Sequence, residues 1–124
     1  MNSQVKIGIA PINWCNDDMP ELGENITLDQ CLSEMQTAGY DGTELGHKFP
    51  KTAEKLHPLL ETYDLSLAAM WHSTYFVENS DLDKELDQLQ QRIEFLIEMG
   101  AKVINLAECS RTVHSNRFLY TLDA

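Results

Sequence analysis

The chain has 124 residues, 43% of them hydrophobic, which suits a single folded domain and excludes a disordered segment. Its 20 acidic residues outnumber 9 basic ones and give a formal net charge of -11. This balance argues against nucleic acid or an anionic membrane as a partner, since binding to either depends on Lys and Arg. We expect small, neutral or metal-bound molecules as partners, with solubility alone as the plain alternative explanation of the acidity.

Cysteine usage and the length of the apolar runs indicate where the chain works. Cys15, Cys31 and Cys109 lie far apart, are odd in number and form no CxxC motif, so neither a zinc knuckle nor a redox pair is predicted. Buried free thiols in a reducing compartment are the expected state. The run from Ile7 to Ile12 lacks a signal-peptide pattern, and nothing approaches the roughly 18 apolar residues that span a bilayer. We therefore expect a cytoplasmic protein without a membrane segment.

Short apolar runs alternate along the chain with longer segments of helical period. Four runs are predicted as strands: Val5–Ala10, Gly42–Gly46, Leu65–Met70 and Lys102–Ala107. Three predicted helices lie between them: Thr27–Gly39, Thr52–Tyr63 and Ser80–Gly100. A polar loop that contains Gly and Pro, from about Asn13 to Asn25, follows the first strand.

The helix ends carry sequence signals. Thr27 is the expected N-cap of the first helix, with Gln30 as its capping-box partner, and Gly39 is the expected C-terminal cap. Ser80 is the expected N-cap of the third helix, whose apolar residues recur at three- and four-residue steps. Pro58 falls inside the second helix, which is therefore predicted to be kinked or to begin late.

A repeated helix–glycine–strand phrase indicates the fold. Ala38–Asp41 and Met99–Lys102 resemble each other, and each leads from a predicted helix through glycine into a strand. Four parallel βα units with the helices outside are therefore predicted, an α/β arrangement equal to about half of a (β/α)8 TIM barrel, which needs about 250 residues. A doubly wound open sheet is the structural competitor, but its glycine-rich GxGxxG loop is missing from the sequence.

Polar residues at the carboxyl ends of the strands are the functional candidates, because barrel active sites form there. They are Asn13, Trp14, Asn16, Asp17 and Asp18 after the first strand, Glu44, His47 and Lys48 at the end of the second, Trp71, His72 and Ser73 after the third, and Asn105, Glu108 and Ser110 at the end of the fourth, with His114 further on. Trp rings beside carboxylates and amides suit a polyol or sugar, because the ring packs on C–H faces while the polar groups bond hydroxyls. Trp14 and Trp71 are therefore predicted to bind substrate.

Each candidate also has a plain structural explanation. Glu44 could be a hydrogen-bonded structural carboxylate, and His47 could be solvated. Asp17 and Asp18 are neighbours whose side chains point apart in an extended loop, so we expect them to cap the loop or lie in solvent rather than to share a metal ion. His57 lies on a predicted helix and is interpreted as structural. The case for a site depends on convergence at one rim, and hence on the fold.

Several stretches of sequence resemble a known enzyme family. The opening segments Ile7–Trp14 and Asn16–Gly23 are followed by Gln30–Met35, Ala38–Gly46 and Lys48–Pro50. These segments closely resemble the opening of inosose dehydratases, members of the xylose isomerase-like TIM-barrel superfamily. The similarity continues through Trp71-His72 and the strand near Val103 to about His114, whereas residues 117–124 resemble no known continuation.

The resemblance implies a metal-dependent lyase. The family removes water from 2-keto-myo-inositol to give a trihydroxycyclohexane-dione in inositol catabolism, with a divalent metal such as manganese or cobalt. A metal would polarise the ketone, a base would take the adjacent proton, and an acid would assist departure of the β-hydroxyl. The metal ligands are expected in later strands, so no metal ligand is assigned here. Glu44, His72 and Glu108 are expected to contact the polyol or cyclitol substrate, or support the metal shell, from a common rim.

By the same resemblance, residues 1–124 are expected to form the amino-terminal half of a barrel, as a single incomplete domain. Four strands alone leave two unpaired edges, so we expect self-association and no dehydratase activity from the isolated chain. Two alternatives stay open: a related metal-dependent sugar isomerase or epimerase, and a non-catalytic subunit that only associates. A DNA repair barrel is disfavoured by the charge of -11.

Overall fold

The computed structural model describes residues 5–77, 81–110 and 112 of the chain. Its elements are β1 (Gly8–Ile9), the 3-10 turn η1 (Pro11–Asn13), α1 (Leu28–Thr37), β2 (Gly42–Glu44), α2 (Ala53–Thr62), β3 (Ser66–Thr74), α3 (Leu82–Glu98) and β4 (Val103–Glu108). The strands form one parallel sheet in the order β1-β2-β3-β4. The predicted α/β fold, four parallel strands with intervening helices, is confirmed.

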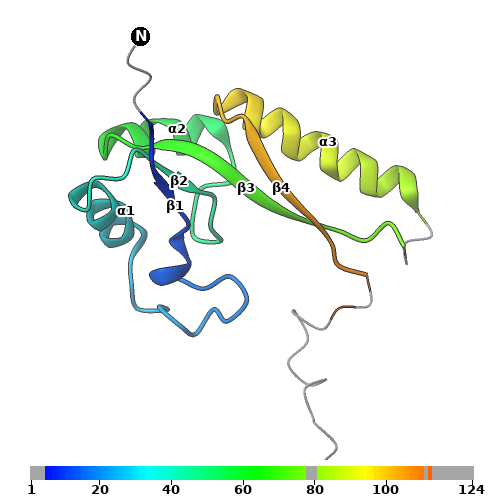
Figure 1. Ribbon diagram of the computed structural model, residues 1–124, viewed down its shortest axis with the longest axis horizontal. Coiled ribbons are helices and arrows are strands. Elements are labelled where there is room, and N and C mark those ends of the chain that lie inside the picture. Colours follow the sequence, from blue (N-terminus) through cyan, green and yellow to red (C-terminus); the bar gives the residue numbers. More distant parts are fainter. Residues whose placement is uncertain (1–4, 78–80, 111, 113–124) are drawn as a thin grey trace, which may run out of the picture.

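The helices cover one face of the sheet and leave the other face open (Figure 1). The core lies between the sheet and the helices and consists of apolar side chains from both layers, among them Leu32, Met35, Leu56, Leu60, Leu67, Met70 and Leu96. Helical residues three and four positions apart supply one side of this core, and alternate strand residues supply the other. All three cysteines are buried, as predicted.

Strand pairing, rather than the length of each apolar run, sets where the strands end. β1 is shorter than the predicted run and consists of two residues, Gly8 and Ile9, which pair with Gly42 and Thr43 of the short strand β2. β3 was expected to end at Met70, but it continues to Thr74 because β4 pairs with it in unbroken register to Glu108. Trp71 and His72 therefore belong to the strand itself and not to a loop beyond it.

The predicted signals bound α1. The Thr27 Oγ1 accepts a hydrogen bond from the Gln30 backbone N–H at 3.1 Å, so the expected N-cap is confirmed. The Gln30 side chain donates to Glu34, one turn further on. Gly39 follows the helix with φ of +86°, the left-handed conformation predicted for its C-terminal cap.

The other two helices differ in detail from the prediction. The N-cap of α3 is Asp81, whose side chain accepts from the Lys84 backbone N–H at 3.1 Å, whereas the predicted cap Ser80 lies outside the described residues. α2 begins at Ala53 and contains Pro58 in its interior, so the alternative of a late start is wrong. A proline at this position still removes one helical hydrogen bond.

A β-bulge in β3 decides which side chains face the open side of the sheet. Two consecutive residues of β2 pair with Leu67 and then with Ala69, so β3 carries one extra residue at this point. Leu67 is buried against the helices, and strict alternation from it would turn Trp71 the same way. The extra residue shifts the alternation by one, so Met70 is buried beneath the helices and Trp71 faces the open side with Glu44.

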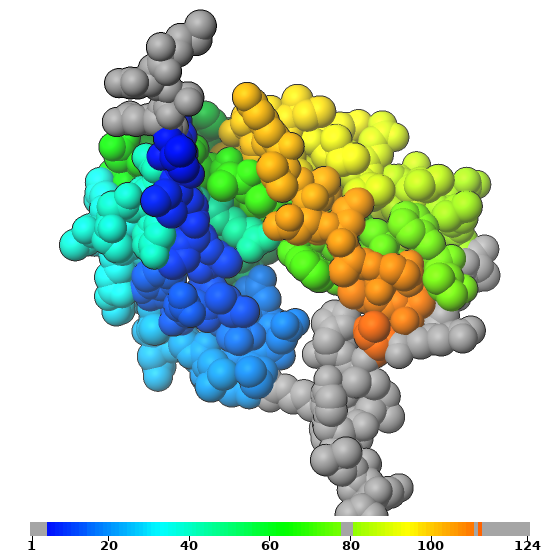
Figure 2. Space-filling view, viewed as in Figure 1, coloured from blue at the N-terminus to red at the C-terminus, as the bar shows by residue number. Residues whose placement is uncertain are grey.

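The edge of the sheet at β4 carries a large exposed apolar surface. Figure 2 shows β4 (orange) along the margin of the sheet, with α3 (yellow) beside it. The exposed apolar side chains of these two elements are Leu82, Leu86, Ile93, Ile97, Val103 and Leu106. The predicted apolar stripe of α3 is thus only partly buried, mainly through Leu96. No helix in the described part of the chain is long and apolar enough to cross a membrane.

Candidate functional site

A pocket lies at the carboxyl edge of β1 and β2, on the open side of the sheet. Its volume is about 280 Å³, close to the lower limit of roughly 300 Å³ for small-molecule sites. It is lined by Ala10, Pro11, Ile12, Asp17, Asp18, Glu44, Leu45 and Trp71. The loop after β1, the end of β2 and the middle of β3 therefore bring three carboxylates and an indole to one cavity, of the size and chemistry that suit a small polyol.

Glu44 and Trp71 converge as predicted, and each is oriented by a neighbour. The Asn105 side chain on β4 reaches across β3 and donates to Glu44 Oε1 at 2.9 Å. Asn105 pairs in register with Trp71, whose indole N–H donates to the Ser73 hydroxyl at 3.0 Å. Trp71 as a whole stays 54% exposed. An oriented carboxylate beside an exposed aromatic ring can bind one hydroxyl and one C–H face of a ring-shaped ligand.

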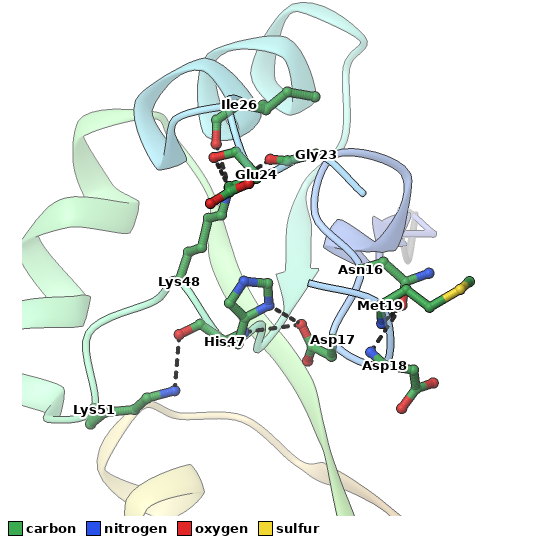
Figure 3. Close-up of polar contacts among 10 residues, drawn as sticks. All are labelled: Asn16, Asp17, Asp18, Met19, Gly23, Glu24, Ile26, His47, Lys48 and Lys51. Carbon is green, nitrogen blue, oxygen red and sulfur yellow. Dashed lines mark hydrogen bonds and ion pairs between the residues drawn. The ribbon is translucent and has the colours of Figure 1, made fainter. Parts of the chain in front are cut away.

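The loop after β1 is fastened to the loop after β2 by an Asp–His pair (Figure 3). Asp17 Oδ1 lies 2.6 Å from His47 Nδ1 and 3.2 Å from the His47 backbone N–H, which donates to it. This double contact gives Asp17 a partner outside its own loop, although its side chain stays 54% exposed, and it decides against the plain alternative that His47 is only solvated. Pairing of the two loops is a tertiary contact between residues 30 apart, so neighbouring sequence gave no signal for it.

Lys48 closes a second contact between the same two loops (Figure 3). Its ammonium donates to the carbonyl oxygens of Gly23 at 2.7 Å, Ile26 at 2.6 Å and Glu24 at 3.2 Å. The bonds to Gly23 and Ile26 are partly buried. Lys51 donates to the His47 carbonyl at 3.3 Å. Lys48 was predicted as a candidate site residue, but its hydrogen bonds give it a supporting role behind the pocket wall.

His72 does not lie on the common rim, so that part of the prediction is wrong. Its side chain faces the helix layer, where it lines a second pocket with residues of α3. The bulge in β3 is the physical reason, because it brings Trp71 to the open side and therefore turns the next residue the other way. Burial is the main cause of the lowered pKa of His72, and the positive charge of Arg92 lowers it further. Glu85 acts in the opposite direction and raises the pKa.

Glu108 also falls outside the pocket. It pairs with Thr74 at the end of β4, and its carboxylate accepts backbone N–H groups of Ser110 at 2.7 Å and Phe76 at 2.9 Å. The hydrogen bond from the Ser110 side chain, with these backbone bonds, lowers the pKa of Glu108. Glu108 thus ties together the segments that follow β3 and β4. The expected rim of Glu44, His72 and Glu108 is reduced to Glu44.

Trp14 is directed toward α1 rather than toward the pocket. Its indole N–H donates to Glu34 Oε2 at 2.6 Å, and its ring packs against the core. This bond is also the main cause of the lowered pKa of Glu34. Of the two tryptophans predicted to contact substrate, the structure brings only Trp71 to the cavity. His114, the remaining histidine of the predicted mouth, lies outside the described residues.

From the sequence, two of the pocket carboxylates were expected only to cap their loop or to lie in solvent. Asp17 and Asp18 follow η1, whose Pro11 begins a tight turn that directs the chain back over the end of β2. The Asn16 side chain accepts from the backbone N–H groups of Asp18 and Met19, both at 2.9 Å, and fixes this turn. An Asn two residues before the second carboxylate was the available signal, since Asx turns fix the direction of the following residues.

The donor set of the described residues does not fit a metal ion. No group of three or more His, Cys, Asp or Glu side chains gathers within the described ranges in a way that could hold one. Asp17 is engaged with His47, and Glu44 with Asn105. The described residues of the pocket can bind and orient a polyol, but they form no metal centre.

Comparisons with known proteins point to one enzyme family. Over 104 residues, 84% of its length, the chain is 49% identical to a protein named inosose dehydratase from Mesomycoplasma hyopneumoniae. Over 112 residues, 90% of its length, it is 44% identical to an inosose dehydratase from Clostridium perfringens. These matches cover 34% and 37% of the two relatives, so the chain spans about a third of their length. No family model matches the chain.

The fold is shared with a solved dehydratase. The crystal structure of the probable 3-DHS dehydratase AsbF from Bacillus anthracis superposes with a TM-score of 0.56 over 82% of this chain and 38% of that protein. The sequences are 14% identical, so the likeness concerns the fold alone. It agrees with the predicted arrangement of parallel βα units as part of a TIM barrel.

Proposed function

We propose that this chain supplies the first βα units of an inosose dehydratase, which eliminates water from 2-keto-myo-inositol, and that the Glu44–Trp71 pocket is where it contacts the substrate. One observation carries the proposal: an oriented carboxylate and an exposed indole share a polyol-sized cavity in a chain 44–49% identical to proteins of that name. A related sugar isomerase or epimerase would need a similar pocket, and only the product of the reaction separates the two.

In this proposal the residues of the chain bind and orient the substrate. Glu44, held by Asn105, accepts a hydrogen bond from a ring hydroxyl, and the indole of Trp71 packs against a C–H face of the ring. Asp18 lines the same cavity and adds a second carboxylate to it. A hydroxyl contact together with a ring contact fixes the ring in one orientation, which is what a stereospecific removal of a proton and a hydroxyl requires.

The divalent metal expected from the resemblance, manganese or cobalt, stays a proposal for the full-length enzyme. The described residues supply no cluster of ligands for it. The groups that take the proton and assist departure of the hydroxyl are likewise not assigned among these residues. The small cyclitol is the proposed ligand, and work in the cytoplasm is the proposed location, supported by three buried cysteines without a disulfide.

Self-association, or docking of further βα units, is part of the same proposal. β1 and β4 are the outer strands of the described sheet, and an exposed apolar surface lies next to β4. Unpaired strand edges and contiguous apolar surface both favour association. We therefore expect the isolated chain to form oligomers and to lack turnover.

A chimera tests the proposed function. The matched third of the Clostridium perfringens protein is replaced by this chain, and the chimera is assayed for conversion of the inosose to the dione, with the epimer as the alternative product. We expect dione formation, and a fall in kcat/KM of at least about tenfold for Glu44→Gln, since Gln keeps an acceptor oxygen but loses the negative charge that strengthens the bond to the substrate hydroxyl. Met19→Gln, at an exposed position of the same loop, is the control.

Two results would contradict the proposal. A folded chimera that releases only an epimer would identify the isomerase alternative. A folded chimera whose activity is unaffected by both Glu44→Gln and Trp71→Ala would show that the substrate binds elsewhere. The isolated chain provides a further check, because turnover by it alone would refute the expectation that further βα units are required.

A further inference from the structure

A second pocket lies on the helix side of the sheet, away from the proposed substrate site. It has a volume of about 470 Å³ and lies between β3, α3 and the segment that precedes α2. The residues that line it are Lys51, His72, Gln88, Gln91, Arg92 and Phe95. Five of these six side chains carry N–H groups, and none is a carboxylate. The wall is thus rich in hydrogen-bond donors.

Positive charge at this pocket contrasts with the rest of the chain. The chain has only 9 basic residues against 20 acidic ones, yet two of the 9 line this one cavity. Within the described residues, neither Lys51 nor Arg92 forms an ion pair with a carboxylate, since the two ion pairs found there are His47–Asp17 and His57–Glu61. Two cationic groups without a paired carboxylate favour an anionic ligand.

His72 adds a polar atom in the wall of the pocket. Its Nε2 is buried, and no hydrogen-bond partner for it lies in the part of the chain described here. Burial, and then the nearby charge of Arg92, lowers its pKa, so the ring is neutral near pH 7. Glu85, the one carboxylate with an opposing effect on His72, is itself buried and accepts the Tyr75 backbone N–H at 3.2 Å. Leaving a buried ring nitrogen without a partner is unfavourable, so a polar ligand at this wall would be stabilising.

We propose that this pocket is a binding site for a small oxyanion, either free phosphate or the phosphoryl group of a small metabolite. The Arg92 guanidinium supplies a planar pair of N–H donors that matches two phosphate oxygens, and Lys51 supplies a second positive charge. Gln88 and Gln91 lie four residues and one residue before Arg92 on α3 and offer amide N–H groups. The site is separate from the Glu44–Trp71 pocket and does not depend on the proposed dehydratase activity.

Lys51 links this site to the loops around the first pocket. Its ammonium donates to the carbonyl of His47, which in turn holds Asp17 in the wall of the first pocket (Figure 3). The 3.3 Å bond to His47 is long, so an anion can compete for the same ammonium at little cost. Occupation of the second pocket would therefore change how Lys51 supports the loop after β2.

Titration of the full 124-residue chain with inorganic phosphate tests the site. The NMR signals of the His72 ring report binding, and ionic strength is held constant with NaCl so that general screening does not contribute. We expect saturable shifts, and an upward movement of the His72 titration midpoint when phosphate is bound. Arg92→Gln should weaken binding at least about tenfold, as expected for loss of a charge-assisted bidentate contact. Lys51→Gln should weaken it several-fold.

A matched variant and a second ligand complete the test. Lys102→Gln makes the same change in charge at an exposed position outside the pocket and should alter the dissociation constant less than twofold. A parallel titration with glycerol 3-phosphate separates the two sources, since tighter binding identifies a phosphoryl metabolite and equal binding identifies the free anion. Shifts that do not saturate, or that are equally weakened by Lys102→Gln and Arg92→Gln, would overturn the proposal.

Discussion

Replacement of Lys48 by Met tests how the two loops around the first pocket are held. The ammonium of Lys48 donates to three carbonyl oxygens of the loop before α1, and its hydrocarbon stem is half-buried. Met keeps the length and apolar character of the stem but removes all three donors. The partly buried carbonyl of Ile26 would then lose its Lys48 donor, that of Gly23 would keep only the bond from the Ile26 backbone N–H, and that of Glu24 can bond water.

The expected cost follows from the number and burial of these bonds. A hydrogen bond to a charged group contributes about 1.5–3 kcal/mol when buried. We count only the two partly buried bonds and take less than the full value for each, since water can reach the loop, which gives about 2 kcal/mol. For a domain of this size, a loss of about 2 kcal/mol lowers Tm by roughly 8 °C.

Thermal and urea unfolding, followed by circular dichroism, measure this loss. Lys55→Met is the matched control, because Lys55 lies exposed on α2 and the same substitution there should change stability by at most about 0.5 kcal/mol. Amide hydrogen exchange should also quicken in the segment from Gly23 to Ile26. If Lys48→Met were no more destabilising than Lys55→Met, the three hydrogen bonds would contribute nothing measurable and the role given to Lys48 would be refuted.

Three further predictions concern other parts of the fold. Gly23→Ala should destabilise the fold far more than Gly39→Ala. Both glycines have positive φ, but a Cβ at Gly23 would lie 1.7 Å from a backbone oxygen, whereas a Cβ at Gly39 would meet nothing within 4 Å. Comparison of the urea unfolding midpoints of the two variants decides this. The pKa of His72 lies below its ordinary value of 6.5, so the unfolded chain binds more protons than the folded chain below that pH, and stability falls as the pH is lowered. His72→Gln should flatten this pH dependence of stability in urea titrations between pH 6.5 and 5. An unchanged slope would exclude His72 as its source. Leu106→Lys, at an exposed position of the edge strand, should raise the monomer fraction in analytical ultracentrifugation without lowering the unfolding midpoint, and an unchanged oligomer distribution would place the contact elsewhere.

Much of the architecture could be predicted from local sequence. The alternation of apolar runs with helical periods gave the order of strands and helices, and Thr27 and Gly39 marked the ends of α1 through short-range hydrogen bonding and backbone conformation. Glu44 could be placed at the mouth of the sheet because it ends a short strand in a repeating βα unit. These features depend on interactions within a few residues, so the sequence alone determines them.

The composition of the pocket depended on contacts that only the tertiary structure provides. One extra residue in β3 exchanges the faces of Trp71 and His72, and the bulge exists because two strands pair out of phase, which no single segment reveals. The Asp17–His47 pair joins residues 30 apart through two loops whose approach depends on the packing of the sheet and helices. Side-chain direction along a strand is set by pairing with its neighbours, and for this reason the sequence identified the right edge of the sheet but assigned some of its residues to the wrong face.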